Sequence, residues 1–381
     1  MKTFIYILLI SVSAASFNAP AYTNESVNAY VLIEAETGEI LLSHNENEQF
    51  PITSLAKIMT LLIIAEELAA GNISFADSVP APPEVMGLKA PVIWLDPGEV
   101  FPLGELVKAV VMSSANDAVL ALAVYAGSSA QEFTNRMNAR AAELGMANTF
   151  FADPGGFNED TVSTARDIAI MTAALFNDGL HEILDKGSFF TTRLSEVRKG
   201  TERESQLVNT NRMAQWYDGI LGGKAGHSRF AGLCIANCAE RGSMRLVAVV
   251  LGSAGEDERD ALCEQLLDSG FADFEYFEPE IDASGFSPLT VTRGVEKAVE
   301  VVPSLPVRFI SHRDEAGEAV FEAALPENIE APIEEGQVVG TFTVRLGDKI
   351  VFECDLTAVC GVEELTFIKS AEFMTERFFG C

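Results

Sequence analysis

A serine and a lysine stand three residues apart at the start of a long apolar segment, in Ser54-Leu55-Ala56-Lys57. Residues with this spacing lie on one face of a helix, so the amine can approach the hydroxyl. A serine needs a base to attack a carbonyl at neutral pH, and a lysine held neutral by burial and a second cation can be that base. Backbone N–H groups at a helix N-terminus can stabilise the oxyanion. The pattern predicts acyl transfer through Ser54, with Lys57 as its base.

The alternative reading of this pair is purely structural, because the spacing arises by chance about once in a chain of this length. In that reading Ser54 caps a helix and the Lys57 ammonium reaches solvent. The segment that follows, Ile58 to Ile64, is apolar nearly all round, which is typical of a buried helix. A lysine in a buried helix needs a functional reason, and this favours the catalytic interpretation.

Two further segments carry side chains suited to the same chemistry. Ser114 and Asn116 lie in Ser113-Ser114-Ala115-Asn116-Asp117, and Gly222-Gly223-Lys224-Ala225-Gly226-His227 comes before a predicted strand. Each segment alone would be read as a helix cap or a glycine turn. In this order, Ser-x-x-Lys, Ser-x-Asn and Lys-x-Gly form the motif set of penicillin-binding proteins and serine β-lactamases.

The elements that position these motifs mix strands with apolar helices. Strands are predicted at Ala29–Glu34, Ile40–His44, Ala231–Asn237 and Arg245–Leu251. Helices are predicted at Ser54–Ala70, Leu103–Met112, Ala115–Tyr125, Ala130–Leu144, Thr164–Phe176 and Asp257–Leu267, with Ser163 or Thr164 as the cap of the fifth. Helices between strands predict an α+β fold, in which helices cover an antiparallel sheet.

Four segments divide the chain. Residues 1–21 have the pattern of a signal peptide, with Lys2, an apolar run from Phe4 to Ile10, and a small-residue cleavage site at Ala19-Pro20-Ala21. Residues 22–277 form the predicted catalytic domain. Residues 278–367, rich in short alternating segments, form a predicted small β-rich domain. In residues 368–381 a helical spacing of apolar side chains predicts an amphipathic helix, which either lies on a membrane surface or packs on the β domain.

Composition excludes some partners. The 381 residues include 56 acidic and 26 basic ones, a formal net charge of −30, which argues against nucleic acid as a partner and against electrostatic binding to anionic lipid. No segment after the signal peptide is long and apolar enough to span a bilayer. The six cysteines of an exported chain form up to three disulfides or stay as buried thiols. Cys234 and Cys238 share one strand and are too far apart for a mutual bridge.

The motif set most resembles the low-molecular-weight D-alanyl-D-alanine carboxypeptidases of the type 5 penicillin-binding protein group, peptidase family S11. The resemblance covers nearly the whole mature chain. Asp153-Pro154-Gly155-Gly156 and Ser163-Thr164-Ala165-Arg166-Asp167 are similar to the family's middle segment, and Met244-Arg245-Leu246-Val247 to a core strand. A β-rich domain and a C-terminal amphipathic helix also match.

The resemblance implies roles for the motif residues: Ser54 is acylated, Lys57 is the base, Ser114 and Lys224 relay protons and polarise the site, and Asn116 holds a substrate amide. The substrate also meets Ala225, Gly226 and His227, and the N–H groups of Ser54 and His227 form the oxyanion hole. Arg259, 35 residues after Lys224, matches the arginine that helps bind the terminal carboxylate. As a lone residue it reads equally well as a surface charge.

One residue departs from the family pattern. Ala225 stands where the family has Thr or Ser. In the family that hydroxyl donates a hydrogen bond to the substrate carboxylate, so its absence here costs about 1–3 kcal/mol of binding free energy. Two rival functions follow. A serine β-lactamase needs a glutamate-activated water, for which the chain offers only Glu159. A degenerate wall-binding protein would fit Ala225, but not the intact Ser54 and Lys57.

The resemblance implies an exported enzyme that removes the terminal D-Ala from peptidoglycan pentapeptide stems and binds β-lactam antibiotics. It acts in the cell wall or at the outer face of the cytoplasmic membrane, with weak membrane contact through the C-terminal helix as an open alternative. No metal or organic cofactor is implied.

Overall fold

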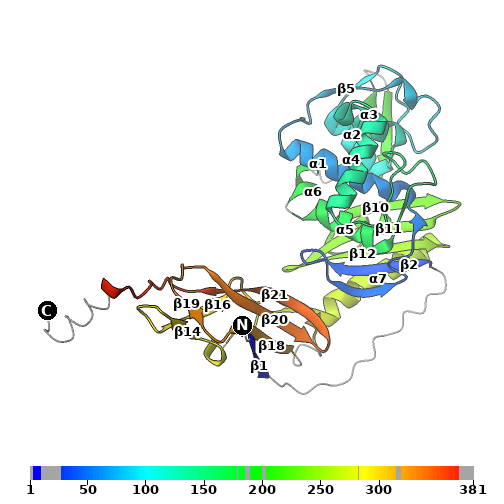
Figure 1. The fold of residues 1–381 in the computed structure, drawn as a ribbon. Coiled ribbons are helices and arrows are strands. Elements are labelled where there is room, and N and C mark those ends of the chain that lie inside the picture. The colour runs from blue at the N-terminus through cyan, green and yellow to red at the C-terminus, as the bar shows by residue number, and fades with distance from the viewer. Residues whose placement is uncertain are drawn as a thin grey trace. The chain divides into compact units, whose positions relative to one another are not determined.

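The computed structural model describes residues 3–9, 27–177, 179–184, 189–199, 203–281, 283–314 and 319–368. The chain divides into two compact units (Figure 1). The larger lies within Ala21–Ala272, and the smaller combines residues of Asp273–Cys381 with residues of Met1–Pro20. Each unit has a hydrophobic core of its own. The motif residues all belong to the larger unit.

A five-stranded antiparallel sheet organises the larger unit, in the order β10-β11-β12-β2-β3. Its strands are β2 (Ala29–Glu34), β3 (Ile40–His44), β10 (Ile220–Ser228), β11 (Gly232–Arg241) and β12 (Met244–Ser253). Because β2 pairs with β12, the start and the end of this unit meet in one sheet. The predicted α+β fold with an antiparallel sheet is confirmed.

Helices cover both faces of this sheet, as the alternation of its side chains requires. Val31 and Val249 belong to the core under the main group of helices. Leu32, the residue after Val31 on β2, and Leu246 of β12 point to the other face of the sheet, where they contact Gly270 of α7 (Glu256–Asp273). The contact is so close that Gly270 has no room for a Cβ. Figure 1 shows α7 on the face opposite to α5.

The helices of the main group lie close to their predicted bounds. They are α1 (Lys57–Ala69), α2 (Leu103–Ser113), α3 (Asn116–Gly127), α4 (Ala130–Glu143) and α5 (Ala165–Phe176). The short α6 (Leu180–Leu184), which follows them, was not predicted. Of the two predicted caps of α5, Thr164 is the one used, since its side chain accepts a hydrogen bond from the Asp167 N–H at 3.1 Å. Ser129 caps α4 in the same way.

The glycine-rich motif precedes β11, the predicted strand, but it also lies inside a strand of its own, β10, which was not predicted. The two glycines are required because neighbouring atoms pack closely against the strand, and not because the chain turns there. A Cβ on Gly223 would lie 2.0 Å from the Ala236 carbonyl oxygen, and one on Gly222 would lie 2.5 Å from the Phe190 Cβ. Smaller elements that were not predicted are β4 (Phe50–Pro51), η1 (Thr53–Ala56), β5 (Ser78–Pro80), η2 (Pro83–Val85), β6 (Val100–Pro102), β7 (Val162–Ser163), β8 (Leu194–Lys199), β9 (Arg203–Val208) and η3 (Arg212–Gln215).

The smaller unit is rich in strands, as predicted, and packs around Phe321 and Phe342. Its main sheet has the order β1-β18-β20-β21-β16. The elements are β1 (Thr3–Leu9), β13 (Phe274–Phe277), η4 (Ala283–Gly285), β14 (Leu289–Thr292), β15 (Ala298–Val299), β16 (Val301–Pro303), β17 (Phe309–His312), β18 (Ala319–Pro326), β19 (Ile329–Glu330), β20 (Val338–Leu346) and β21 (Lys349–Ala358). Since β13 pairs with β17, the contacts of this unit begin before the predicted boundary at residue 278.

Two predictions concern the ends of the chain. Residues Thr3–Leu9 of the predicted signal peptide form β1, paired with β18. The predicted cleavage site at Ala19-Pro20-Ala21 and residues 369–381 of the predicted C-terminal helix lie outside the described residues. Within the described ranges, no helix combines the length and apolar character needed to cross a membrane.

Candidate active site

Ser54 sits on a tight turn that leads into the central helix. It belongs to η1, and α1 follows directly with Lys57 as its first residue. Thr53, just before Ser54, has a φ of 48°, in the left-handed region that non-glycine residues rarely adopt. Strained backbone of this kind persists only where the surroundings hold it, and it is common at active sites.

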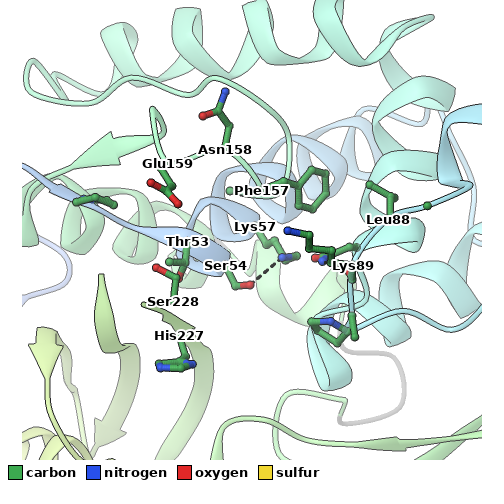
Figure 2. Close-up of a pocket in the computed structure, with 16 residues that line it drawn as sticks. Thr53, Ser54, Lys57, Leu88, Lys89, Phe157, Asn158, Glu159, His227 and Ser228 are labelled. Atoms are coloured by element: carbon green, nitrogen blue, oxygen red, sulfur yellow. Dashed lines mark hydrogen bonds between the residues drawn. The ribbon is translucent and has the colours of Figure 1, made fainter. Parts of the chain in front are cut away.

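Lys57 is buried, 1% exposed, and its amine faces the serine (Figure 2). Lys57 Nζ donates hydrogen bonds to Ser54 Oγ at 2.8 Å and to the Gly155 carbonyl oxygen at 2.9 Å. Burial lowers the pKa of Lys57 well below its usual value, the positive charge of Lys224 lowers it further, and Asp153 opposes both. A neutral amine in this position has a lone pair that can accept the Ser54 proton.

The segment after Asp153 completes the surroundings of this amine. Asp153 accepts hydrogen bonds from the N–H groups of Gly155 at 2.8 Å, Phe157 at 3.0 Å and Asn158 at 2.7 Å. This folds the loop so that the Gly155 carbonyl reaches Lys57 and the Phe157 ring lies 5.5 Å from its Nζ. The loop therefore orients the Lys57 amine and shields it from water.

Two glycines make room for the strained turn. A Cβ on Gly156, which has a φ of +70°, would lie 1.8 Å from the Thr53 carbonyl oxygen. A Cβ on Gly226 of β10 would lie 2.4 Å from Thr53 Oγ1 and 3.4 Å from the Ser54 nitrogen. The Lys-x-Gly motif thus brings the backbone of β10 against Thr53 and Ser54.

Lys224 is the second buried amine, 1% exposed. Burial lowers its pKa to about 7. Its positive charge also lowers the pKa of Lys57. At neutral pH Lys224 can thus both give and take a proton.

The Ser-x-Asn motif lies at the junction of α2 and α3. Ser114 follows α2 as its C-cap, with a φ of 59°, and its buried hydroxyl has no hydrogen-bond partner among the described residues. Asn116 donates from Nδ2 to the Lys89 carbonyl oxygen at 2.8 Å and from its N–H to the Pro91 carbonyl oxygen at 2.8 Å. Asn116 thereby anchors the neighbouring loop.

Asp117, which the sequence did not single out, holds the same loop further along. This buried carboxylate accepts hydrogen bonds from the N–H groups of Ile93 at 3.1 Å and Leu95 at 3.0 Å. Between them, Trp94 has a φ of 60° and is 72% exposed. The loop from Lys89 to Leu95 is therefore fixed to the start of α3 at several points. Nothing in the sequence pattern reveals these contacts, because they join segments more than twenty residues apart.

A cavity of about 410 Å³ opens onto Ser54. Its walls come from the turn that carries Ser54, from residues 87–91, from the loop after Asp153 and from the end of β10 (Figure 2). It is lined by Pro51, Thr53, Ser54, Lys57, Gly87, Leu88, Lys89, Ala90, Pro91, Asn116, Gly156, Phe157, Asn158, Glu159, His227 and Ser228. Of the predicted site residues, the cavity brings together Ser54, Lys57, Asn116 and His227.

The other predicted residues are not among the described residues that line the cavity: Ser114, Lys224, Ala225, Gly226 and Arg259. Lys224, Ala225 and Gly226 lie on β10 just before His227, and all three are buried. Arg259 of α7 is 3% exposed and donates from Nε and Nη2 to Asp260 Oδ1 at 2.8 and 2.6 Å. It is not among the described residues that line the cavity. Its predicted contact with the substrate carboxylate stays a prediction.

Comparison with known proteins identifies the relatives of this chain. The family model for D-alanyl-D-alanine carboxypeptidase matches residues 15–255, and that for the penicillin-binding protein 5 C-terminal domain matches residues 280–364. The chain belongs to the D-alanyl-D-alanine carboxypeptidase family. This membership makes it a serine hydrolase of the carboxypeptidase class.

Individual relatives agree with this assignment along most of the chain. D-alanyl-D-alanine carboxypeptidase DacF of Bacillus subtilis (strain 168) is 32% identical over 380 residues, 97% of this chain and 96% of that protein. DacC of Escherichia coli (strain K12) is 30% identical over 346 residues, 88% of this chain and 84% of its own. The structure of penicillin-binding protein 5 from Haemophilus influenzae superposes with a TM-score of 0.78 at 26% identity, covering 92% of this chain and 100% of that one.

Proposed function

We propose that this family member removes the terminal D-Ala from peptidoglycan pentapeptide stems through an acyl-Ser54 intermediate, and that β-lactam antibiotics acylate the same serine. The observation that carries the proposal is the 2.8 Å contact between Lys57 Nζ and Ser54 Oγ, made by an amine whose pKa burial has lowered. The relatives named D-alanyl-D-alanine carboxypeptidase support the substrate.

In the proposed reaction, Ser54 Oγ attacks the carbonyl carbon of the penultimate D-Ala and Lys57 Nζ accepts the hydroxyl proton. The negative charge that develops on the carbonyl oxygen is stabilised by the N–H groups of Ser54 and His227. The peptide bond then breaks, and the proton that Lys57 accepted passes through Ser114 and Lys224 to the leaving amine, which restores the neutral Lys57 amine. Water hydrolyses the ester, which releases the shortened stem and restores Ser54. The close approach of Gly226 to the Ser54 nitrogen supports the oxyanion assignment.

The test follows the mass of the purified protein after mixing with benzylpenicillin, together with D-Ala release from a pentapeptide ending in D-Ala-D-Ala. A long-lived adduct of one penicilloyl group and steady D-Ala release support the proposal. An inert protein in both assays supports the degenerate wall-binding alternative and rejects the proposal.

Rapid return to the unmodified mass would instead favour the serine β-lactamase alternative. Glu159 is the candidate for the water-activating glutamate of that alternative, since it lines the same cavity as Ser54. If Glu159 activated the hydrolytic water, Glu159→Gln would prolong the lifetime of the penicilloyl adduct. An unchanged lifetime rules out that role.

We propose further that the enzyme is exported and acts outside the cytoplasm, at the cell wall or the outer face of the membrane. The signal-peptide pattern and the peptidoglycan substrate support this localisation. N-terminal sequencing of protein recovered from outside the cell should begin within a few residues of Tyr22. Mature protein that starts at Met1 and stays in the cytosol would refute the export proposal.

A further inference from the structure

The part of the site that meets the substrate's terminal carboxylate lacks the expected donor. Ala225 has no hydroxyl, and the Arg259 guanidinium is buried against Asp260. A peptide carboxylate that loses its water needs charged or polar partners in the protein. Lys224, next to Ala225, can supply an amine as one donor to this carboxylate. A hydroxyl donor must come from another part of the chain.

Thr210 places a hydroxyl beside that amine. Thr210 Oγ1 lies 3.5 Å from Lys224 Nζ, although the two residues are fourteen positions apart in the sequence. Unlike Lys224, Thr210 is exposed to solvent, so its hydroxyl is open to a ligand. The distance is at the long end for a hydrogen bond, which leaves both groups available to a better acceptor.

The backbone around Thr210 is held rigidly by its two neighbours. Asn209, 3% exposed, donates from Nδ2 to the carbonyl oxygens of Phe190 at 2.9 Å and Thr192 at 3.1 Å. Asn211, 2% exposed, donates from Nδ2 to Asn237 Oδ1 at 2.7 Å. Two buried amides therefore fix the segment and present only the Thr210 side chain outward. Preorganised donors bind an anion without the cost of ordering them first.

A third contact connects Thr210 to the Ser-x-Asn motif. Its N–H donates to the Met112 carbonyl oxygen at 2.8 Å, two residues before Ser114. Ser114 has a buried hydroxyl with no partner in the described part of the chain. Thr210 thus joins the end of α2, which carries Ser114, to β10, which carries Lys224.

We propose that Thr210 donates a hydrogen bond to the terminal carboxylate of the substrate, together with Lys224, and replaces the hydroxyl that is missing at Ala225. This inference rests on the proposed function, because it names the group that selects a free carboxylate at the substrate's end. The enzyme then discriminates a carboxypeptidase substrate from the same peptide ending in an amide through Thr210.

The experiment compares Thr210→Val, which keeps the shape of the side chain, with Thr210→Ser, which keeps the hydroxyl. Two peptides are used, identical except that one ends in D-Ala-D-Ala with a free carboxylate and the other in the corresponding amide. Thr210→Val is expected to lower kcat/KM for the carboxylate peptide about 10- to 150-fold, the range for a hydrogen bond to a charged group. Its effect on the amide peptide is expected to stay within about twofold. Thr210→Ser should resemble the native enzyme on both.

A rescue measurement sharpens the test. Ala225→Thr should raise kcat/KM for the carboxylate peptide more in the Thr210→Val protein than in the native one, because the two hydroxyls serve the same group. Equal losses on both peptides, no loss on either, or equal gains in both backgrounds would each overturn the proposal, since Thr210 would then act through Lys224 or through packing alone.

Binding to the Ser54→Ala protein separates this inference from the proposed function. Affinity for the two peptides reads the carboxylate contact without any turnover. A weaker affinity for the carboxylate peptide alone, on adding Thr210→Val to Ser54→Ala, supports the inference even if the native enzyme released no D-Ala. An affinity unchanged by Thr210→Val contradicts the inference even if the native enzyme were active.

Discussion

At the scale of single residues, the site depends on two lysines that the fold removes from water. Lys57 and Lys224 are each 1% exposed, and burial is the first cause of the lowered pKa of both. Burying two amines costs folding free energy, and buried groups with a perturbed pKa occur most often at functional sites. The same burial that disfavours the charge favours a neutral Lys57 amine beside Ser54, as the proposed mechanism requires.

The pH dependence of acylation should report Lys57. Because the neutral amine is the reactive form, the rate of acylation by benzylpenicillin should rise with pH through the lowered pKa of Lys57 and level off above it. Lys57→Arg keeps a charge that cannot be lost, so the rate should fall about 100- to 10,000-fold. Stopped-flow acylation rates from acid to neutral pH measure both effects. A rate that Lys57→Arg leaves intact would show that another group is the base.

The stability of the protein should report Lys224. Its pKa is about 7 in the folded protein and 10.5 for a free lysine, so between these values the unfolded state binds the extra proton. The free energy of unfolding should therefore rise with pH from about 7 to 10.5 as a contribution of Lys224. Urea unfolding of the native protein and of Lys224→Met across this window measures the contribution. The two curves should converge as pH rises, and parallel curves would contradict the assignment.

At the scale of elements, the turn that carries Ser54, η1, depends on two segments that pack against it. Gly156 comes from the loop after Asp153, and Gly226 comes from β10. Neither segment is near Ser54 in the sequence. The geometry of Ser54 therefore depends on tertiary packing as much as on the helix that follows it.

A matched pair of glycines tests this dependence. Gly156 and Gly71 have φ angles of +70° and +73°, so an alanine costs about 1–2 kcal/mol of backbone strain at either position. Only at Gly156 would the new Cβ clash, with the Thr53 carbonyl oxygen, whereas at Gly71 nothing lies within 4 Å. Gly156→Ala should slow penicillin acylation of Ser54 at least about tenfold, since small displacements of reacting groups are costly.

Gly71→Ala is the control, and it should lower the melting temperature while leaving the acylation rate unchanged. Acylation rates for the two variants, normalised to folded protein by circular dichroism, provide the comparison. If both variants acylate at the native rate, the turn does not depend on Gly156.

These elements also show what the sequence could and could not predict. The fold class and most helix bounds followed from apolar periodicity, and the family followed from three short motifs. The strand that contains Gly222 and Gly223 was missed, because a glycine required by close packing looks the same in sequence as a glycine in a turn. The contacts of Asp117 and Thr210 could not be predicted, since they depend on which distant backbone groups the fold brings near.

At the scale of the whole molecule, the chain combines a strongly acidic surface with two separate cores. The net charge of −30 favours solubility and disfavours anionic partners. The question of disulfides, left open by the sequence, is answered for the five cysteines that the structure describes, all of which are free. Four are buried, and burial raises the pKa of Cys234 to about 11 and that of Cys263 to about 12.

The reactivity of the thiols should follow this burial. Only the thiolate reacts with iodoacetamide, so the buried thiols should stay unmodified in the native protein while the exposed Cys360 is alkylated. In denaturant, Cys234, Cys238, Cys263, Cys354 and Cys360 should all react. Peptide mass mapping before and after unfolding gives the result for each site. Modification of Cys234 in the native protein, or a bridge between any two of the five, would contradict the structure.

The most direct test of the account is to map the penicillin adduct to a residue. The native protein, treated with benzylpenicillin and digested, should carry the penicilloyl group on the peptide that contains Ser54 and at that residue. Ser54→Ala should abolish the adduct while its circular dichroism spectrum and melting temperature stay near native, because the substitution removes only a hydroxyl. An adduct on another residue, or one that survives in Ser54→Ala, would contradict the claim that Ser54 is the nucleophile activated by Lys57.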